Sequence, residues 1–135
     1  MHRILVIDDE VDVRDGIKRV LDRAGFSVRT VDNATDAMLE LKRLAADVVI
    51  TDIIMPKVNG VDAIDRILRE FPMVRIVAIS GGGNFDVTGY QPAAITTTAY
   101  LAAAKRAGAH VILTKPFESR ELIEAVEQVL GASGL

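Results

Sequence analysis

The sequence predicts an α/β fold built around a parallel β-sheet. Two short β-branched apolar runs, residues 4–7 and 48–51, each end abruptly in aspartates (Asp8, Asp9 and Asp52). Apolar runs of this length, bounded by polar residues, are typical of strands buried on both faces of a parallel sheet. Strand-like and helix-like segments also alternate along the chain, as they do in repeated βα units. The length of 135 residues, half of them apolar, fits one domain with a substantial core.

The first part of the chain contains three expected strands and two expected helices. In chain order these are a strand over residues 3–7, an amphipathic helix with apolar positions from Val13 to Ala24, an outer strand over residues 26–31, a helix with apolar positions from Ala37 to Leu44, and a strand ending at Asp52. Gly25 is expected at the C′ position of the first helix, where a left-handed backbone suits glycine. Asp32 or Asn33 is expected to cap the second helix, because either side chain can accept a hydrogen bond from a free backbone N–H.

The second part of the chain begins with a turn-rich segment, residues 55–60. The elements expected after it are a helix with apolar positions from Val61 to Leu68, a strand over residues 74–80, a helix over residues 96–107 that stops at Gly108, a strand over residues 110–114, and a helix from an N-cap at Ser119 to Gly131. Residues 81–95 begin with consecutive glycines and show little periodicity. We therefore expect one domain over residues 1–131, with an extended loop near residues 81–95 and a short tail at residues 132–135.

Composition limits the classes of partner. The net charge of −3 argues against a nucleic-acid surface, which normally carries a basic patch. The chain has no cysteine, which favours a reducing compartment. No segment approaches the roughly 18 consecutive apolar residues of a membrane span, and no signal peptide is recognisable. We expect a cytoplasmic protein that contacts neither membrane nor nucleic acid.

The polar residues at the strand ends predict a metal site. If both acidic runs follow parallel strands, Asp8, Asp9 and Asp52 emerge at the carboxyl edge of the sheet, where ligands bind in open α/β folds. Carboxylates gathered at one place repel one another unless a cation lies among them. Oxygen ligands of this kind favour Mg²⁺, which binds a few carboxylates and keeps waters or phosphate oxygens as its other ligands.

Two further residues extend this site. Ser80 ends the fourth expected strand with a hydroxyl, and Lys115 ends the fifth with an ammonium. Together with the carboxylates they complement a metal ion and a tetrahedral anion such as a phosphoryl group. Asp52 is the candidate nucleophile, because a carboxylate can attack phosphorus to give an aspartyl phosphate.

In this order, the residues resemble the receiver domain of bacterial two-component response regulators. The resemblance runs from Ile4 to about Leu130, and the residues that carry it are Asp8-Asp9, Asp52 followed by Ile53-Ile54-Met55-Pro56 and Gly60, Ser80, and Lys115-Pro116-Phe117. It implies a flavodoxin-like fold, which is a doubly wound sheet of five parallel strands in the order 2-1-3-4-5 with five helices.

The resemblance also implies a role for each site residue. Asp52 would accept a phosphoryl group from the phosphohistidine of a histidine kinase or a histidine phosphotransfer protein. The ligands of Mg²⁺ would be Asp9, Asp52 and the backbone carbonyl of Ile54, with Asp8 helping through water. Lys115 would pair with the phosphoryl group, and the Lys115–Pro116 peptide would be cis. Ser80 would move toward the phosphoryl group and so switch a surface that binds an unknown downstream protein, with the chain a monomer or a weak dimer.

Two features depart from the family pattern. An aromatic residue usually stands three positions before the lysine, where this chain has Ile112, and the stretch from Ser80 to Lys115 is longer than in most receivers. We expect residues 81–95 to order, or to move with Ser80, on phosphorylation.

Two other functions are alternatives to that of a phosphoacceptor. A phosphorylation-independent interaction module is favoured by Ile112 and the long loop, but the acidic residues and Lys115 argue against it. A metal-dependent phosphohydrolase would want a general acid two positions after Asp52, where this chain has Ile54. The receiver's slow autodephosphorylation would only end the signal, so we do not expect a conventional enzyme. His2 and His110 are not expected to bind metal, and the basic residues of the helices are expected to be solvated (Arg14, Lys18, Arg23, Arg66 and Arg69).

Overall fold

The computed structural model describes residues 1–55, 58–80 and 102–133, and for residues 54, 55, 58–60, 132 and 133 the description covers the backbone alone. A parallel sheet of five strands forms its centre, in the order β2-β1-β3-β6-β7. These strands are β1 (Arg3–Ile7), β2 (Ser27–Val31), β3 (Val48–Asp52), β6 (Arg75–Ser80) and β7 (Val111–Thr114). Counted among themselves they have the predicted order 2-1-3-4-5. The fold prediction is therefore confirmed.

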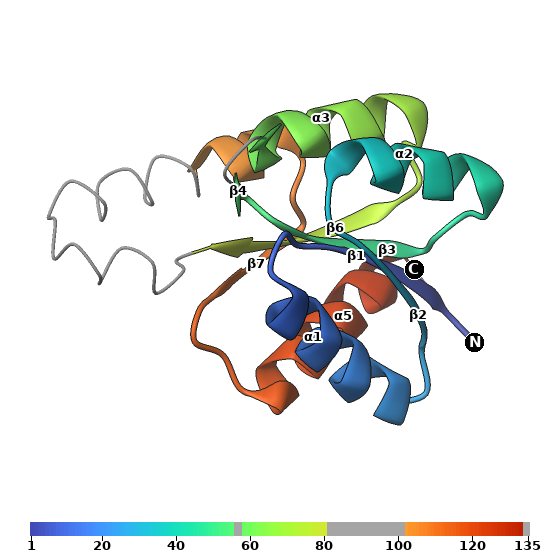
Figure 1. The fold of residues 1–135 in the computed structure, drawn as a ribbon, viewed down its shortest axis with the longest axis vertical. Coiled ribbons are helices and arrows are strands. Elements are labelled where there is room, and N and C mark those ends of the chain that lie inside the picture. The colour runs from blue at the N-terminus through green and yellow to red at the C-terminus, as the bar shows by residue number, and fades with distance from the viewer. Residues whose placement is uncertain (56–57, 81–101, 134–135) are drawn as a thin grey trace, which may run out of the picture.

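The helices lie in two layers, one on each face of the sheet (Figure 1). On one face are α1 (Val11–Arg23) and α5 (Ser119–Ser133), and on the other are α2 (Ala34–Arg43) and α3 (Gly60–Glu70). Residues 102–107 form a further helical segment on the α3 side. No helix in the described ranges is both long and apolar enough to span a membrane.

Each strand contributes to two separate cores, which explains why the apolar runs are uninterrupted. In β1, Leu5 and Ile7 pack into the core under α2 and α3, whereas Ile4 and Val6 pack into the core under α1 and α5. Successive side chains of a strand point to opposite faces. A strand covered by helices on both faces therefore needs apolar residues at every position.

Local signals at the helix ends are partly confirmed. Gly25 follows the C-cap of α1 with φ +97°, as expected for a C′ glycine. Of the two candidate caps for α2, Asn33 is the one used, because its side chain accepts the N–H of Asp36 at 2.7 Å. The Lys115–Pro116 peptide is cis, as predicted.

The predictions for α5 were wrong at both ends. The N-cap is not Ser119 but the residue before it, since Ser119 is already helical and the Glu118 N–H donates to Glu121 Oε1 at 2.9 Å. This is the reciprocal half of a capping box, in which an acid three residues into the helix satisfies the cap's own N–H. Gly131 does not end the helix, which continues to Ser133. Glycine weakens a helix interior by only about 1 kcal/mol, so neighbouring turns can carry the helix through it.

Smaller differences concern the element boundaries. Strands β2, β6 and β7 each begin one residue later than predicted, and α3 already begins at Gly60. The segment predicted as turn-rich contains a two-stranded antiparallel hairpin of β4 (Ile54–Met55) and β5 (Val58–Asn59). The expected loop at residues 81–95 and the start of the helix expected from residue 96 lie outside the described residues.

Candidate phosphoacceptor site

Strand pairing brings Asp8 and Asp52 to the same edge of the sheet. Ile7 of β1 pairs with Thr51 of β3, so the next residue of each strand is one of the two aspartates. Both side chains are buried, with 1% of Asp8 and 6% of Asp52 exposed. Two buried carboxylates on neighbouring strands repel each other, and this repulsion requires positive charge nearby.

Lys115 supplies that charge from the end of β7, the edge strand two positions beyond β3 in the sheet. It follows β7, and its N–H donates to the Ser80 carbonyl at 2.9 Å, which extends the β6–β7 ladder by one residue. Its Nζ lies 3.2 Å from Asp52 Oδ2 and 4.0 Å from Asp8 Oδ2. The predicted convergence of these three residues is therefore present in the structure.

Backbone contacts fix the orientation of Asp8. Its N–H donates to the Val31 carbonyl at 3.2 Å, and its Oδ1 accepts the Glu10 N–H at 2.9 Å. Among the described residues, its buried Oδ2 has no hydrogen-bond partner. The pKa of Asp8 is raised to about 6, chiefly by burial and in part by the charges of Asp52 and Asp9, while the hydrogen bond from Glu10 and the charge of Lys115 act in the opposite direction. A buried oxygen without a hydrogen bond, on a carboxyl group that resists ionisation, is a good position for a cation to occupy.

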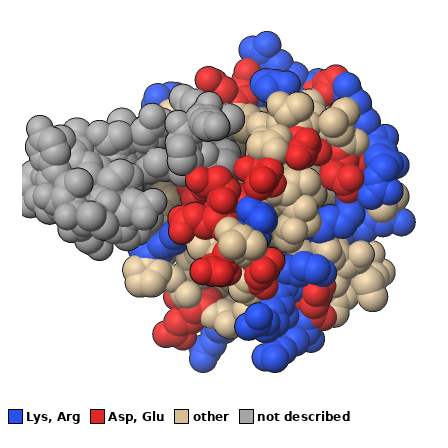
Figure 2. Space-filling model, in the orientation of Figure 1, with Lys and Arg blue, Asp and Glu red and all other residues tan. Residues whose placement is uncertain are grey.

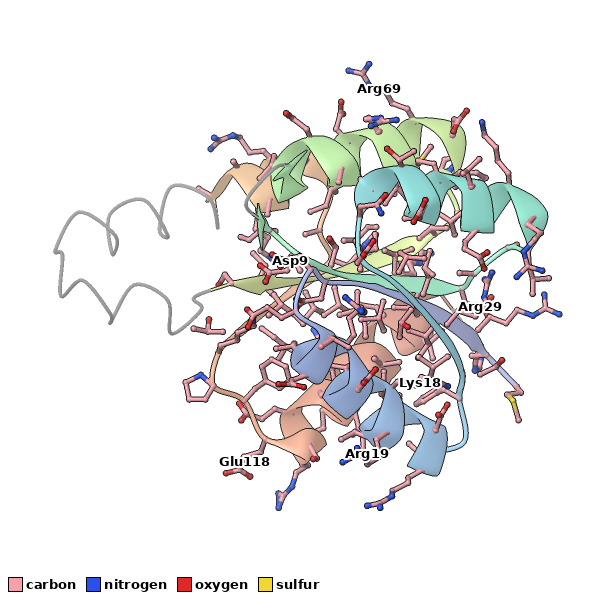
Figure 3. All side chains as sticks on the ribbon, in the orientation of Figure 1. Asp9, Lys18, Arg19, Arg29, Arg69 and Glu118 are labelled. Atoms are coloured by element: carbon pink, nitrogen blue, oxygen red, sulfur yellow. The ribbon has the colours of Figure 1, made fainter. Side chains whose placement is uncertain are left out.

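The two residues after Asp8 bring further carboxylates close to it. One carboxylate oxygen from each of Asp8, Asp9 and Glu10 lies within 4.8 Å of the others, with Asp9 and Glu10 exposed. Figure 3 shows Asp9 just beyond the end of β1, and Figure 2 shows acidic side chains gathered near the middle of the same face. The donor set is all oxygen and partly open to water, which fits Mg²⁺.

The ligands expected from the sequence are Asp8, Asp9, Asp52 and the backbone carbonyl of Ile54, and Glu10 is not among them. The third acid in the run Asp8-Asp9-Glu10 was the signal that could have included it. The prediction that Asp9 shares a cation with Asp52 and the carbonyl of Ile54 stays a prediction. Ile54 begins β4, two residues after Asp52, which ends β3.

Ser80 and Ile112 lie on the two strands beyond Asp52. Ser80 is fully buried at the end of β6, and its Oγ has no hydrogen-bond partner among the described residues. Ile112, one residue before Leu113 on β7, is partly buried against the core under α2 and α3. An unpaired hydroxyl next to the Asp52–Lys115 pair is available to a new acceptor, and it would gain a hydrogen bond there.

The contact between Arg14 and Asp8 was not predicted from the sequence. The Arg14 side chain, expected in solvent, is partly buried and donates from Nη1 to the Asp8 backbone carbonyl at 2.8 Å. His110, by contrast, has the expected structural role, because its Nδ1 accepts the Ile76 N–H at 3.0 Å.

Buried acids, a lysine paired with one of them and a buried hydroxyl at the carboxyl edge of a doubly wound sheet are the groups that a phosphoacceptor site requires. The family model described as "Response regulator receiver domain" matches residues 4–127. The chain belongs to this family, which provides the phosphoacceptor domains of bacterial two-component systems.

The relatives differ in length. The chain is 31% identical over 128 residues to the chemotaxis protein CheY of Thermotoga maritima, covering 94% of this chain and 96% of that protein. It is 36% identical to the DNA-binding transcriptional regulator NtrC of Azospirillum brasilense, covering 96% of this chain but 24% of NtrC. The crystal structure of the NtrX receiver domain from Brucella abortus superposes with a TM-score of 0.80 at 32% identity, over 95% of this chain and 98% of that one.

Proposed function

We propose that Asp52 is the residue phosphorylated in this receiver, and that the phosphodonor is the phosphohistidine of a histidine kinase or a histidine phosphotransfer protein. The observation that carries the proposal is the ion pair between Lys115 Nζ and Asp52 Oδ2, at 3.2 Å and next to buried Asp8. An aspartate with a fixed cation beside it can receive a phosphoryl group whose oxygens then take over that cation.

The transfer needs positioning and charge neutralisation more than covalent chemistry by other groups. An oxygen of the Asp52 carboxylate forms a bond to phosphorus, and the phosphorus–nitrogen bond of the donor breaks. The electron pair of that bond stays on the imidazole, which then takes up a proton. Lys115 stabilises the negative charge of the transferred group, because its ammonium already lies at the acceptor oxygen.

The loop formed by Asp8, Asp9 and Glu10, called the acidic loop below, is the proposed site of Mg²⁺, which when bound supplies positive charge to the phosphoryl oxygens. Asp9 and Asp8 are the ligands we favour, with Asp8 acting directly or through a water, and Glu10 is close enough to take part. We retain Asp52 and the backbone carbonyl of Ile54 as the ligands from the β3 side.

Ser80 is the proposed switch residue. Its buried Oγ would donate a hydrogen bond to a phosphoryl oxygen on Asp52, because it has no competing partner in the described part of the chain. With Ile112 in place of an aromatic residue, the response would pass through Ser80 and the segment that follows it rather than through a rotating ring. The surface that changes would bind a downstream protein.

The remaining proposals concern the cellular setting. We place the protein in the cytoplasm, as a monomer or weak dimer that contacts neither membrane nor nucleic acid through this domain. NtrC is described as DNA-binding, but this chain spans only 24% of it. The slow loss of the phosphoryl group would end the signal, which is not turnover by a conventional enzyme.

The test is the mass of the intact protein after incubation with acetyl phosphate and Mg²⁺. We expect the mass to rise by one phosphoryl group in the wild type and to stay unchanged in Asp52→Asn. Asp62→Asn, at an acid in the first turn of α3, is the matched control and should be labelled like the wild type. An unlabelled wild type, or label that persists in Asp52→Asn, would contradict the proposal.

A further inference from the structure

Three acidic residues of the site, Asp8, Asp9 and Glu10, lie on an irregular loop that joins β1 to α1. Residues 8–10 belong to neither element, so no ladder or helix holds all of their peptide groups. Carboxylates on a loose loop would repel one another and spread apart. Tight binding of a small cation such as Mg²⁺ needs its ligands to be held in near-ideal geometry.

Arg14 is tied to both ends of this loop. Its guanidinium donates to the Asp8 carbonyl at 2.8 Å, and its backbone N–H donates to the Glu10 carbonyl at 3.0 Å. The second bond belongs to the first turn of α1 and would exist with any residue at this position. The first bond depends on the side chain, whose planar, permanently charged group is well suited to holding a carbonyl in place.

The contact with Arg14 completes the immobilisation of Asp8. The Asp8 N–H is held by Val31, its Oδ1 is held by the Glu10 N–H, and its carbonyl is held by Arg14. Oδ2 is the remaining polar atom, and it lies on the side of Lys115. The hydrogen bond from Arg14 therefore fixes the peptide that joins Asp8 to Asp9, and with it the direction in which both side chains leave the loop.

We infer that Arg14 is a positioning residue for the divalent-cation site: it does not bind the ion but holds the loop that does. The inference rests on the proposed function only in taking the acidic loop as the Mg²⁺ site. The inference predicts a change in cation affinity opposite to the change expected from charge alone. Arg14 carries a positive charge close to the site, so removing that charge alone should strengthen the binding of a cation. If positioning dominates, the same substitution weakens it.

The experiment compares Arg14→Ala with Arg19→Ala. Arg19 lies on the same helix but is exposed and projects from a part of α1 distant from Asp9 (Figure 3), so its substitution removes an equal charge without touching the loop. We expect Arg14→Ala to weaken Mg²⁺ binding about five- to tenfold in calorimetric titration, and Arg19→Ala to stay within twofold of the wild type. Arg14→Lys, whose ammonium can donate to the same carbonyl, should recover at least half of the loss on a logarithmic scale. An affinity that is unchanged or tighter in Arg14→Ala, or a Lys variant no better than Ala, would overturn the inference.

A second measurement needs no metal and no phosphorylation. The amide of Glu10 is bonded to Asp8 Oδ1, so its hydrogen exchange in metal-free protein reports whether the loop is held. We expect this amide to exchange at least about fivefold faster in Arg14→Ala, with amides in the middle of α5 unchanged as the control for the fold. Equal exchange in the wild type and the variant would overturn the inference. Failure of Asp52 to become phosphorylated would contradict the proposed function alone, because it alters neither the Mg²⁺ affinity nor this exchange rate.

Discussion

Lys115 and Asp52 are 63 positions apart in the sequence, yet the Nζ of one lies 3.2 Å from the Oδ2 of the other. The lysine side chain is only 15% exposed, so the pair is largely shielded from water. Shielded charges interact more strongly than the exposed ion pairs of the helix surfaces, such as Lys18–Asp22. Lys115 therefore holds the Asp52 carboxylate in place and keeps a positive charge beside it.

The first prediction concerns this pair. Lys115→Gln should lower the rate of Asp52 phosphorylation by acetyl phosphate by about 100-fold, the order of magnitude seen when one donor to a developing charge is removed. The rate is followed by intact mass at saturating Mg²⁺. Lys105→Gln removes the same charge from an exposed position and should leave the rate within about twofold. A rate above one third of the wild-type value in Lys115→Gln would show that the ion pair does not assist transfer.

The second prediction follows from the pKa of Asp8, which burial raises from 3.8 to about 6. The unfolded chain loses this proton near pH 3.8 and the folded chain near pH 6, so ionising Asp8 costs stability as the pH rises through this interval. At pH 7 Asp8→Asn should therefore unfold at a higher urea concentration, with a gain of up to about 3 kcal/mol in the free energy of unfolding. Below about pH 4 the gain should vanish, because the wild-type carboxyl is then protonated as well.

The ionisation of Asp8 should also be visible in the pH dependence of Mg²⁺ binding. Only the carboxylate form of Asp8 binds a cation, so the affinity of the wild type should fall as the pH drops through about 6. Asp15→Asn, at an exposed acid on α1, is the control for both measurements and should change neither. The raised pKa of Asp8 and its role in Mg²⁺ binding would be contradicted by two results together. These are equal stability of Asp8→Asn and the wild type at pH 7, and a Mg²⁺ affinity that does not change between pH 7.5 and 5.

Much of this site could be predicted from the sequence, because strand register fixes it. Once residues 4–7 and 48–51 are parallel neighbours, Asp8 and Asp52 must leave the same edge of the sheet. The position of Lys115 can be predicted by the same rule, because it is the first residue after β7, which is parallel to β6. These residues are placed by the backbone, and the backbone is set by the apolar pattern.

Contacts that depend on side-chain conformation could not be predicted in this way. Arg14 has the spacing of a solvated helix residue, and only the path of the loop brings the Asp8 carbonyl to its guanidinium. At the start of α5 the sequence offers two possible N-caps, Glu118 with Glu121 as its partner and Ser119, and the structure uses the first. In both cases several arrangements agree with the sequence, and packing in three dimensions selects one.

The third prediction concerns His110, whose pKa is lowered by burial and by the charge of Arg75. Its Nδ1 accepts the Ile76 N–H at 3.0 Å and must be unprotonated to do so. The folded state therefore favours the neutral ring, and this contribution to stability is lost as the pH falls below about 6.5.

We accordingly expect His110→Gln to lose less stability than the wild type between pH 7 and pH 5.5 in urea unfolding. The chain has only one other histidine, His2, which is exposed, so His2→Gln should follow the wild-type curve. Parallel curves for the wild type and His110→Gln would show that the ring is equally protonated in both states.

The last prediction compares three glycines with different backbones. Gly108 has φ +121°, and a Cβ there would overlap the Leu68 Cδ1 atom, which belongs to a side chain packed against the core. Gly25 has φ +97° but open space, and Gly16 lies inside α1 with open space and no positive φ. A positive φ strains any residue with a Cβ, whereas alanine is the better helix former at an ordinary helical position.

Gly108→Ala should therefore lower the free energy of unfolding by about 2–3 kcal/mol, since backbone strain and a displaced Leu68 add together. Gly25→Ala should cost only about 1 kcal/mol, from backbone strain alone. Gly16→Ala should raise the stability by about 0.5–1 kcal/mol. Urea unfolding of the three variants at pH 7 measures the order directly. A Gly108→Ala variant as stable as Gly25→Ala would mean that Leu68 rearranges without cost, and the junction between the helical segment 102–107 and β7 would then be less tightly packed than its contacts indicate.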